Sequence, residues 1–407
     1  MNRAADLPVT LEDILAARER IAAAVSPTPC RLSHRLSAHC GAEVWLKLEN
    51  LQLTGSFKER GALNKMLLLD PTQRAAGVVA ASAGNHAQAV AHTAQGLGIR
   101  ATIVMPETAP LTKVRGTQAF GAEVVLHGAS FAEAFERARA LEAEHGYTLI
   151  HAFDDPAVIA GQGTIALELI EQVPELDTVV VPVGGGGLIA GIAVAVKALR
   201  PEARIVGVQT QRMPAMRESL AAGHIQHLRP TSTIADGISI ANVGTHTFPI
   251  IQHHVQAVHT VSEDAIASAI MRLLEGDKTL AEGAGAVGVA AVYEGQIALA
   301  PTGRAALVIS GGNIDMTRLS VLLERGLESD GRIAHLEVVV PDTPGSIAVL
   351  AAAVADQRAN ILHIYQTRHI GEVELGEIEV ELSLETKGHE HVAAIVEAIR
   401  ARGFRVR

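Results

Sequence analysis

Short apolar runs alternate with longer alanine-rich stretches from about residue 40 to residue 327. The runs are rich in Val and Ile, as is typical of strands that are buried on both faces, whereas the longer stretches show helical spacing. The expected strands cover 44–49, 78–82, 101–106, 123–128, 178–183, 204–210 and 305–312, and the expected helices cover 85–97, 113 onward, 131–145, 188–200 and 316–326. This alternation predicts an α/β fold with a mostly parallel sheet covered on both faces.

The pattern changes after a polar, glycine-containing stretch at 328–333. The expected elements beyond it, in β-α-β-β-α-β order, cover 335–342, 345–358, 359–368, 372–386, 389–402 and the last four residues. This order is the ferredoxin-like unit. We therefore expect a first region over 1–327, a linker over 328–333 and a small α+β domain over 334–407.

Composition is that of a globular chain with aliphatic cores. Apolar residues make up 48% of the 407 residues, charged residues 19% and aromatic residues 3%. These values exclude a disordered, collagen-like or coiled-coil chain. The 34 basic and 44 acidic residues give a net charge of −10, and this acidic balance argues against a nucleic-acid partner.

Two features bear on where the chain resides. Its two cysteines, Cys30 and Cys40, are too few for a disulfide framework and indicate reduced thiols in the cytoplasm. The stretch 178–196 has no charge and resembles a membrane span in that respect, but it contains Pro182 and four consecutive glycines. A helix through them costs roughly 7 kcal/mol in propensity, at about 3 for proline and about 1 for each glycine. We expect a strand, a turn and a helix there, and no membrane partner.

Four expected strand ends carry unusual loops, and ligands of open α/β sheets bind at the carboxyl ends of strands. The first loop is the run of four glycines from Gly184 to Gly187, before an apolar helix that starts at Leu188. Glycines let the backbone approach an anion closely, and the helix N-terminus adds a favourable dipole. A tight turn needs one or two glycines rather than four, so we favour a phosphate site here.

The same run also fits the dinucleotide fingerprint in the form Gly185-x-Gly187-x-x-Ala190. That fingerprint expects an acidic residue at the end of the next strand, where Gln209 stands instead. A single phosphate therefore fits better than a dinucleotide. An NAD-dependent oxidoreductase is the disfavoured alternative.

The second loop, Ser82-Ala83-Gly84-Asn85-His86, joins an expected strand to an expected helix. Ser82 can cap the helix, Gly84 permits close approach, and Asn85 and His86 can reach a ligand. Exposed backbone N–H groups at this position suit a substrate carboxylate. A well-capped helix start without a ligand is the alternative interpretation.

The third loop contains the amine of Lys58, and the fourth contains the hydroxyl of Ser310. Lys58 stands in an expected first helical turn, where the helix dipole favours anions rather than cations. A lone lysine of this kind is ordinarily solvated; the alternative is a Schiff-base amine beside an anionic cofactor. The loop from Ser310 to Asn313 could place a hydroxyl beside a cofactor ring, or be a plain turn.

Six motifs in order resemble those of the fold-type II pyridoxal-phosphate enzymes, and more narrowly the threonine ammonia-lyase (threonine dehydratase) branch. They are TGSFKERGA, ASAGNHAQ, VGGGGLIAG, TIADGI, AEGAGA and SGGN, and the resemblance covers about residues 10 to 327. The tail resembles an ACT regulatory domain through PDTPGS and RANI. The resemblance implies a two-lobed, tryptophan synthase beta-like catalytic region, with a small lobe (about 50–150) inserted in a large lobe (1–49 and 151–327).

The resemblance implies pyridoxal 5'-phosphate as the cofactor, joined to Lys58 as an imine. It assigns the phosphate to the backbone N–H groups of Gly184, Gly185, Gly186, Gly187 and Leu188. It assigns the cofactor ring to the side chains or backbone of Phe57, Asn85, Gly237, Glu282 and Ser310. Asn85 would bond the ring hydroxyl, and the Ser310 hydroxyl would meet the pyridine nitrogen.

For the substrate, the resemblance implies that its carboxylate is held by the loop of Ser82, Ala83, Gly84, Asn85 and His86. The freed neutral amine of Lys58 would remove the Cα proton, and the β-hydroxyl would leave. Threonine would then yield 2-oxobutanoate and ammonia, and serine would yield pyruvate. Serine racemases place a second hydroxyl where Ala83 stands, so we expect poor racemisation. A serine or 3-hydroxyaspartate ammonia-lyase is the alternative within the family.

The ACT-like tail implies control by an amino-acid effector such as isoleucine, or a domain that serves only oligomerisation. Ligands of such domains often lie at a dimer interface, which points to Asp342, Gly345, Ser346 and Asn360 and to a homo-oligomer, a dimer or a tetramer. A non-catalytic amino-acid sensor is the alternative from another class. We expect no metal, because Gln209 stands where metal-binding members carry a glutamate and the histidines show no zinc-type spacing.

Overall fold

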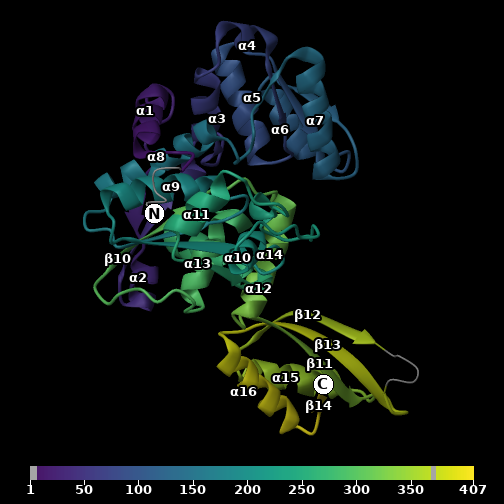
Figure 1. The fold of residues 1–407 in the computed structure, drawn as a ribbon. Coiled ribbons are helices and arrows are strands. Elements are labelled where there is room, and N and C mark those ends of the chain that lie inside the picture. The colour runs from purple at the N-terminus through teal and green to yellow at the C-terminus, as the bar shows by residue number, and fades with distance from the viewer. Residues whose placement is uncertain (1–6, 368–372) are drawn as a thin grey trace. The chain divides into compact units, whose positions relative to one another are not determined.

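The computed structural model describes residues 7–367 and 373–407 (Figure 1). The chain divides into two compact units, Met1–Ile314 and Asp315–Arg407. The sequence placed the boundary at 327, whereas the structure groups helix α14 (Met316–Ser329) with the C-terminal unit. We call the two units the catalytic unit and the C-terminal unit.

Six strands form the larger sheet of the catalytic unit, in the order β1-β2-β10-β7-β8-β9. β1 runs antiparallel to β2, and all the other neighbours are parallel. Every residue of β7 is buried, as its continuous apolar run predicts. The bounds are β1 Cys30–Leu32, β2 Glu43–Leu48, β7 Thr178–Pro182, β8 Arg204–Thr210, β9 Ala257–Val261 and β10 Arg304–Ile309.

Four parallel strands form the smaller sheet, in the order β5-β4-β3-β6. Their bounds are β3 Val78–Ala81, β4 Ala101–Met105, β5 Glu123–Leu126 and β6 Thr148–Leu149. Helices connect successive strands, and Ala and Val side chains of β3 and α5 share one buried cluster. The smaller sheet and its helices form what we call the small lobe, and the larger sheet belongs to the large lobe.

The helices of the catalytic unit begin where the sequence supplies caps. The Ser130 hydroxyl accepts from the Glu133 N–H at the start of α7, and the Asp155 carboxylate caps α8, whose first residue is Pro156. The bounds are α1 Leu11–Ile21, α2 His34–Cys40, η2 Glu49–Leu51, α3 Lys58–Leu67, α4 Pro71–Ala76, α5 Asn85–Leu97, α6 Leu111–Ala119, α7 Phe131–His145, α8 Pro156–Gln172, α9 Gly187–Leu199, α10 Ala215–Ala222, η3 Asp236–Ile238, α11 Thr247–His254, α12 Glu263–Arg272, η4 Leu273–Asp277 and α13 Gly283–Tyr293.

The C-terminal unit contains a four-stranded antiparallel sheet in the order β12-β13-β11-β14, with two helices. The chain order β11-α15-β12-β13-α16-β14 is the expected ferredoxin-like arrangement. Its core joins strand residues such as Val338 and Val380 to Leu350 of α15 and Ile395 of α16. The bounds are β11 Ile333–Pro341, α15 Ser346–Asp356, β12 Asn360–Thr367, β13 Glu377–Glu385, α16 His389–Arg400 and β14 Arg405–Val406.

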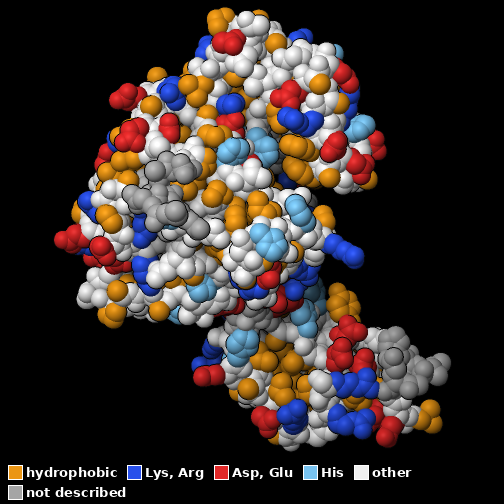
Figure 2. Space-filling view, viewed as in Figure 1, with side chains coloured by type: hydrophobic (Ala, Val, Ile, Leu, Met, Phe, Trp, Pro, Cys, Tyr) orange, Lys and Arg blue, Asp and Glu red, His pale blue; other side chains and the backbone are white. Residues whose placement is uncertain are grey.

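Three further features concern membrane-spanning helices, cysteines and surface charge. Over the residues that the structure describes, none of the helices is both long and apolar enough to cross a membrane. Cys30 and Cys40 are both free. Figure 2 shows acidic and basic side chains interspersed over the visible face of the catalytic unit.

Candidate active site

Lys58 is the first residue of α3, and its side chain is partly buried. Its Nζ donates a hydrogen bond to the Ala152 carbonyl at 2.7 Å and lies 5.1 Å from the centre of the Phe57 ring. Burial lowers the pKa of this amine from 10.5 to about 8, although the nearby Glu282 carboxyl raises it. The amine is therefore far more often neutral near pH 7 than an exposed lysine amine.

Backbone hydrogen bonds join the loop before Lys58 to the loop after β10. The Phe57 N–H donates to the Ser310 carbonyl at 3.1 Å, and the Gly312 N–H donates to the Gly55 carbonyl at 2.9 Å. The Ser310 side chain is buried, with 3% of its surface exposed. The hydroxyl expected at the cofactor ring and the lysine expected to hold the cofactor are thus held close together.

The glycine loop lies between β7 and α9, and β7 is the neighbour of β10 in the larger sheet. Gly185, Gly186 and Gly187 are buried, and Gly186 has a φ of +102°. A Cβ on Gly185 would overlap the Phe153 ring, and one on Gly187 would come within 2.8 Å of the Phe153 carbonyl. Side chains are excluded here by packing as well as by backbone conformation.

The backbone of this loop is suited to an anion. None of the N–H groups from Gly184 to Leu188 donates to an acceptor in the ranges that the structure describes. They stand at the N-terminal end of α9, where the helix dipole also favours negative charge. The phosphate site that the sequence predicted has the required donors, and a bound phosphate would satisfy them.

The loop from Ser82 to His86 follows β3 in the small lobe and leads into α5. The Ser82 hydroxyl accepts a hydrogen bond from the Gly84 N–H at 3.1 Å, and Gly84 is the N-cap of α5, so Ser82 does not cap the helix as the sequence predicted. The N–H groups of Asn85 and His86 belong to the first turn of α5, where a helix offers no carbonyl to accept them. These two donors can hold a carboxylate.

The His86 side chain is buried and carries no positive charge at neutral pH. Only 3% of its surface is exposed, and its Nε2 lies 2.7 Å from the Ile150 carbonyl. Burial, and then the charge of Lys58, lower the pKa of the imidazole to about 3. A neutral imidazole cannot pair electrostatically with a carboxylate, so only the backbone of His86 suits that task.

Asn85, Glu282 and Gly237 lie together at the junction of the two lobes. The Asn85 amide donates to the Glu282 Oε1 at 2.7 Å, and a Cβ on Gly237 would come within 3.2 Å of the same oxygen. Burial, and then the charge of Asp236, raise the pKa of Glu282 to about 8. At pH 7 the carboxyl is mostly protonated, so it places little charge at this position.

Two further contacts, at Asn85 and at Asp236, were not predicted from the sequence. The Asn313 amide donates to the Asn85 Oδ1 at 2.9 Å and to the Thr54 carbonyl at 2.7 Å, which orients Asn85. The Lys113 ammonium of α6 pairs with the Asp236 carboxylate at 2.8 Å, between the small lobe and the large lobe. Asn313 is the last residue of the SGGN motif, but the pairing of Lys113 with Asp236 has no local signal in the sequence.

Gln209 stands where the metal-binding members of the family are expected to carry a glutamate. Its side chain is fully buried and hydrogen-bonded. Its amide nitrogen donates to the Val183 carbonyl at 3.1 Å, and its Oε1 accepts from the Arg217 N–H at 3.0 Å. Within the ranges that the structure describes, no group of three or more His, Cys, Asp or Glu side chains could hold a metal ion.

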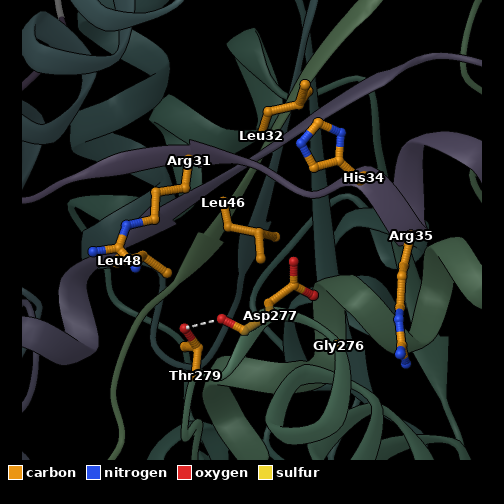
Figure 3. A pocket seen from close by; sticks show the side chains of 9 residues that line it. All are labelled: Arg31, Leu32, His34, Arg35, Leu46, Leu48, Gly276, Asp277 and Thr279. Atoms are coloured by element: carbon orange, nitrogen blue, oxygen red, sulfur yellow. Dashed lines mark hydrogen bonds between the residues drawn. The ribbon is translucent and has the colours of Figure 1, made fainter.

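A cavity of about 220 Å³ lies elsewhere in the catalytic unit (Figure 3). Leu46 and Leu48 of β2 line it, with Arg31, Arg35 and Asp277 among the charged side chains. No residue expected to bind the cofactor or the substrate lines this cavity. It is therefore separate from the site around Lys58.

The four residues expected at an effector site do not meet within one chain. Asp342, Gly345 and Ser346 follow the end of β11, whereas Asn360 starts β12 and pairs with Glu385 at the opposite end of the sheet. β11 pairs with β13 along nine residues, so at about 3.3 Å per residue the two ends lie roughly 26 Å apart. These residues can share a ligand only if a second copy brings them together.

Comparisons with known proteins show the family of the chain. Residues 21–311 match the family described as "Pyridoxal-phosphate dependent enzyme", and residues 334–404 match the ACT domain. The chain belongs to this enzyme family. The expected fold type is thus confirmed, and the cofactor of the chain is pyridoxal phosphate.

Individual relatives narrow the comparison. The L-threonine ammonia-lyase of Thermotoga maritima is 47% identical over 98% of this chain and 99% of that protein. The structure of a threonine deaminase from T.th. is 46% identical, with a TM-score of 0.72 over 75% of this chain and 99% of that one. Maize serine racemase is 37% identical, with a TM-score of 0.74 over 79% of this chain and 98% of that one.

The residues present fit the cofactor of the family. The glycine loop offers unpaired N–H donors at a helix N-terminus, which suits its phosphate. Lys58 offers an amine that loses its proton near neutral pH, which suits its aldehyde. The Ser56 hydroxyl, beside Phe57, is buried without a partner among the described residues.

Proposed function

We propose that this chain is an L-threonine ammonia-lyase, which converts L-threonine to 2-oxobutanoate and ammonia by β-elimination. The observation that carries the proposal is the Lys58 amine, with its pKa lowered to about 8, beside the Ser310 loop. The likeness to the Thermotoga maritima enzyme over nearly the whole chain supports the choice of substrate.

The bound cofactor supplies an electron sink for the negative charge that develops at Cα. Lys58, when neutral, is the base that removes the Cα proton. Its bond to the Ala152 carbonyl holds the free amine in place when Lys58 is not joined to the cofactor. The N–H groups of Asn85 and His86 bind and orient the substrate carboxylate, and the N–H groups of the glycine loop fix the phosphate.

The groups around the ring favour elimination over transamination. The Ser310 hydroxyl is neutral, and the raised pKa of Glu282 leaves its carboxyl mostly protonated at pH 7. Neither group stabilises a full positive charge on the ring as a carboxylate would. The methyl group of Ala83 offers no proton, so the chain has no hydroxyl there to reprotonate Cα for racemisation.

We also propose that an amino acid such as isoleucine regulates the enzyme through its ACT domain, and that the chain works in the cytoplasm as a homo-oligomer. The placement of Asp342 and Asn360 at opposite ends of one sheet supports the oligomer, because a shared ligand needs a second copy. The two free cysteines are in keeping with a reducing compartment.

The test is release of 2-oxo acid from L-threonine, L-serine and L-3-hydroxyaspartate by the purified chain and by Lys58→Ala, with and without isoleucine. We expect the highest kcat/KM for threonine, a smaller value for serine, and a loss of at least about a thousandfold in kcat for the variant. A higher kcat/KM for serine or 3-hydroxyaspartate would replace the substrate. Full activity in Lys58→Ala would overturn the mechanism.

A further inference from the structure

The His86 imidazole has an acceptor atom that none of the described residues uses. Its Nε2 lies 2.7 Å from the Ile150 carbonyl, and a carbonyl only accepts, so Nε2 carries the proton. In the neutral ring Nδ1 is then an acceptor. This atom is buried and has no hydrogen-bond partner among the described residues. A buried acceptor of this kind points to a donor that comes from outside the chain.

The imidazole lies near the reacting amine, because the charge of Lys58 helps to lower the pKa of the imidazole. His86 bonds to the Ile150 carbonyl and Lys58 bonds to the Ala152 carbonyl, two residues further along the same segment. The backbone of His86 also belongs to the turn that we assign to the substrate carboxylate. A donor that reaches Nδ1 is therefore most simply a donor on the bound amino acid.

The chemistry of the ligands leaves one such donor. The substrate carboxylate and the cofactor phosphate are acceptors. The substrate amine must exchange with Lys58, so it faces the cofactor. The β-hydroxyl is the remaining group with a proton to share.

We propose that Nδ1 of His86 accepts a hydrogen bond from the β-hydroxyl of the substrate, which makes His86 a specificity-determining residue for 2-amino-3-hydroxy acids. This inference rests on the proposed function. His86 positions the C–O bond that breaks and does not supply the proton for the departing water, because Nδ1 carries none.

Two substitutions separate the two ring nitrogens. His86→Gln keeps an amide nitrogen near the place of Nε2, so it preserves the bond to Ile150 and removes the acceptor. His86→Asn keeps a carbonyl oxygen near the place of Nδ1, so it preserves the acceptor and removes the bond to Ile150. The two variants are matched controls for each other.

Two substrates separate the hydroxyl from the rest of the amino acid. L-serine and β-chloro-L-alanine share their carbon skeleton, and both yield pyruvate and ammonia after elimination. Serine loses water on elimination and β-chloroalanine loses chloride together with the Cα proton, and each then consumes one water in the hydrolysis that releases ammonia. The chloride leaving group has no proton to donate. The measurement is the ratio of initial-rate kcat/KM for serine to that for β-chloroalanine.

We expect His86→Gln to lower this ratio roughly tenfold, as the loss of one hydrogen bond implies, and His86→Asn to keep it within about twofold of the wild-type ratio. An unchanged ratio in His86→Gln, or a collapsed ratio in His86→Asn, overturns the proposal and leaves water as the partner of Nδ1. If His86→Gln does not fold, His86→Ala, which also removes the acceptor, takes its place, and an unchanged ratio there overturns the proposal. A wild-type chain that turns over neither substrate refutes the proposed function instead.

Discussion

The loops that precede α9 and α5 have the same plan, a strand end, glycine and a helix start, yet their surroundings differ. A Cβ on Gly185 would overlap Phe153, and one on Gly186 would come within 2.7 Å of the Thr247 hydroxyl. A Cβ on Gly84 would meet nothing within 4 Å. The large-lobe loop is thus shaped by its neighbours, which suits a permanently bound group. The small-lobe loop leaves space, which suits a ligand that enters and leaves.

The largest expected effect comes from a methyl group in the crowded loop. Gly185→Ala forces either Phe153 or the loop backbone to move, and overpacking of this kind costs about 1–3 kcal/mol. Because we propose that the same backbone holds the phosphate, we expect the Kd for the cofactor to rise roughly thirtyfold. Titration of the apoenzyme with pyridoxal phosphate, followed by absorbance, measures this.

A second substitution shows whether crowding is the cause. The double variant Gly185→Ala/Phe153→Val removes ring atoms that the new methyl would overlap, so it should recover much of the affinity. Recovery would be absent if Gly185 mattered only for its backbone freedom. Wild-type affinity in Gly185→Ala alone would refute the contrast between the two loops.

The open loop should respond in the opposite way. Gly84 has a φ of −128°, so alanine meets no left-handed strain there, and its methyl group points into empty space. We expect Gly84→Ala to bind the cofactor as the parent does, but to raise KM for threonine roughly tenfold, because the methyl occupies room that the substrate needs. Steady-state kinetics on the fully loaded enzyme measure this. An unchanged KM would show that the space at Gly84 is not used by the substrate.

We assign Lys58 a role toward both the cofactor and the substrate. The pH dependence of its amine tests whether burial lowers its pKa as the packing indicates. An exposed lysine gains little neutral fraction between pH 7 and pH 9, whereas an amine with a pKa of about 8 goes from roughly 9% to 91% neutral. Only the neutral amine attacks the cofactor aldehyde. We expect the rate of cofactor recapture by the apoenzyme to rise about tenfold over this range and then level off. A rate that still climbs steeply above pH 9 would indicate an ordinary lysine.

Much of this arrangement is predictable from local patterns, and the exceptions have physical reasons. The helices at Asn85–Leu97 and Phe131–His145 match their expected bounds because each ends at a glycine with positive φ and follows a clear strand or cap. Helix α8 was not anticipated, because its residues from 158 to 169 are all buried and show no polar face. Its signal was the Asp155-Pro156 cap.

Some features of the site are likewise predictable from the sequence, and others are not. The prediction of a phosphate site at the glycine loop follows from composition, since few other tasks need four glycines in a row. The neutral state of Glu282 could not be predicted, because it depends on Asp236 and on burial between segments far apart in the chain. The opposite placement of Asp342 and Asn360 follows from the β11-α15-β12 crossover, which starts β12 at the same end of the sheet as β11, and the two loop motifs alone do not show it.

The smallest expected effect concerns the ion pair between the lobes that carry the two loops. Lys113 and Asp236 are both partly exposed, with 27% and 40% of their side-chain surfaces accessible, and such pairs contribute about 0.2–1 kcal/mol. Since Lys113 belongs to the lobe of the open loop, Lys113→Met should weaken substrate binding and spare the cofactor. We expect KM for threonine to rise about two- to fivefold, with Lys113→Arg close to the parent.

The control is Arg139→Met, which removes an exposed ion pair with Glu142 within the single helix α7. It should leave KM within experimental error, because that pair joins no two lobes. Added salt should also raise KM in the parent and leave Lys113→Met less affected, since exposed charges are screened. If salt raises KM equally in both enzymes, the Lys113–Asp236 pair does not contribute to substrate binding. The two lobes would then be independent in this respect.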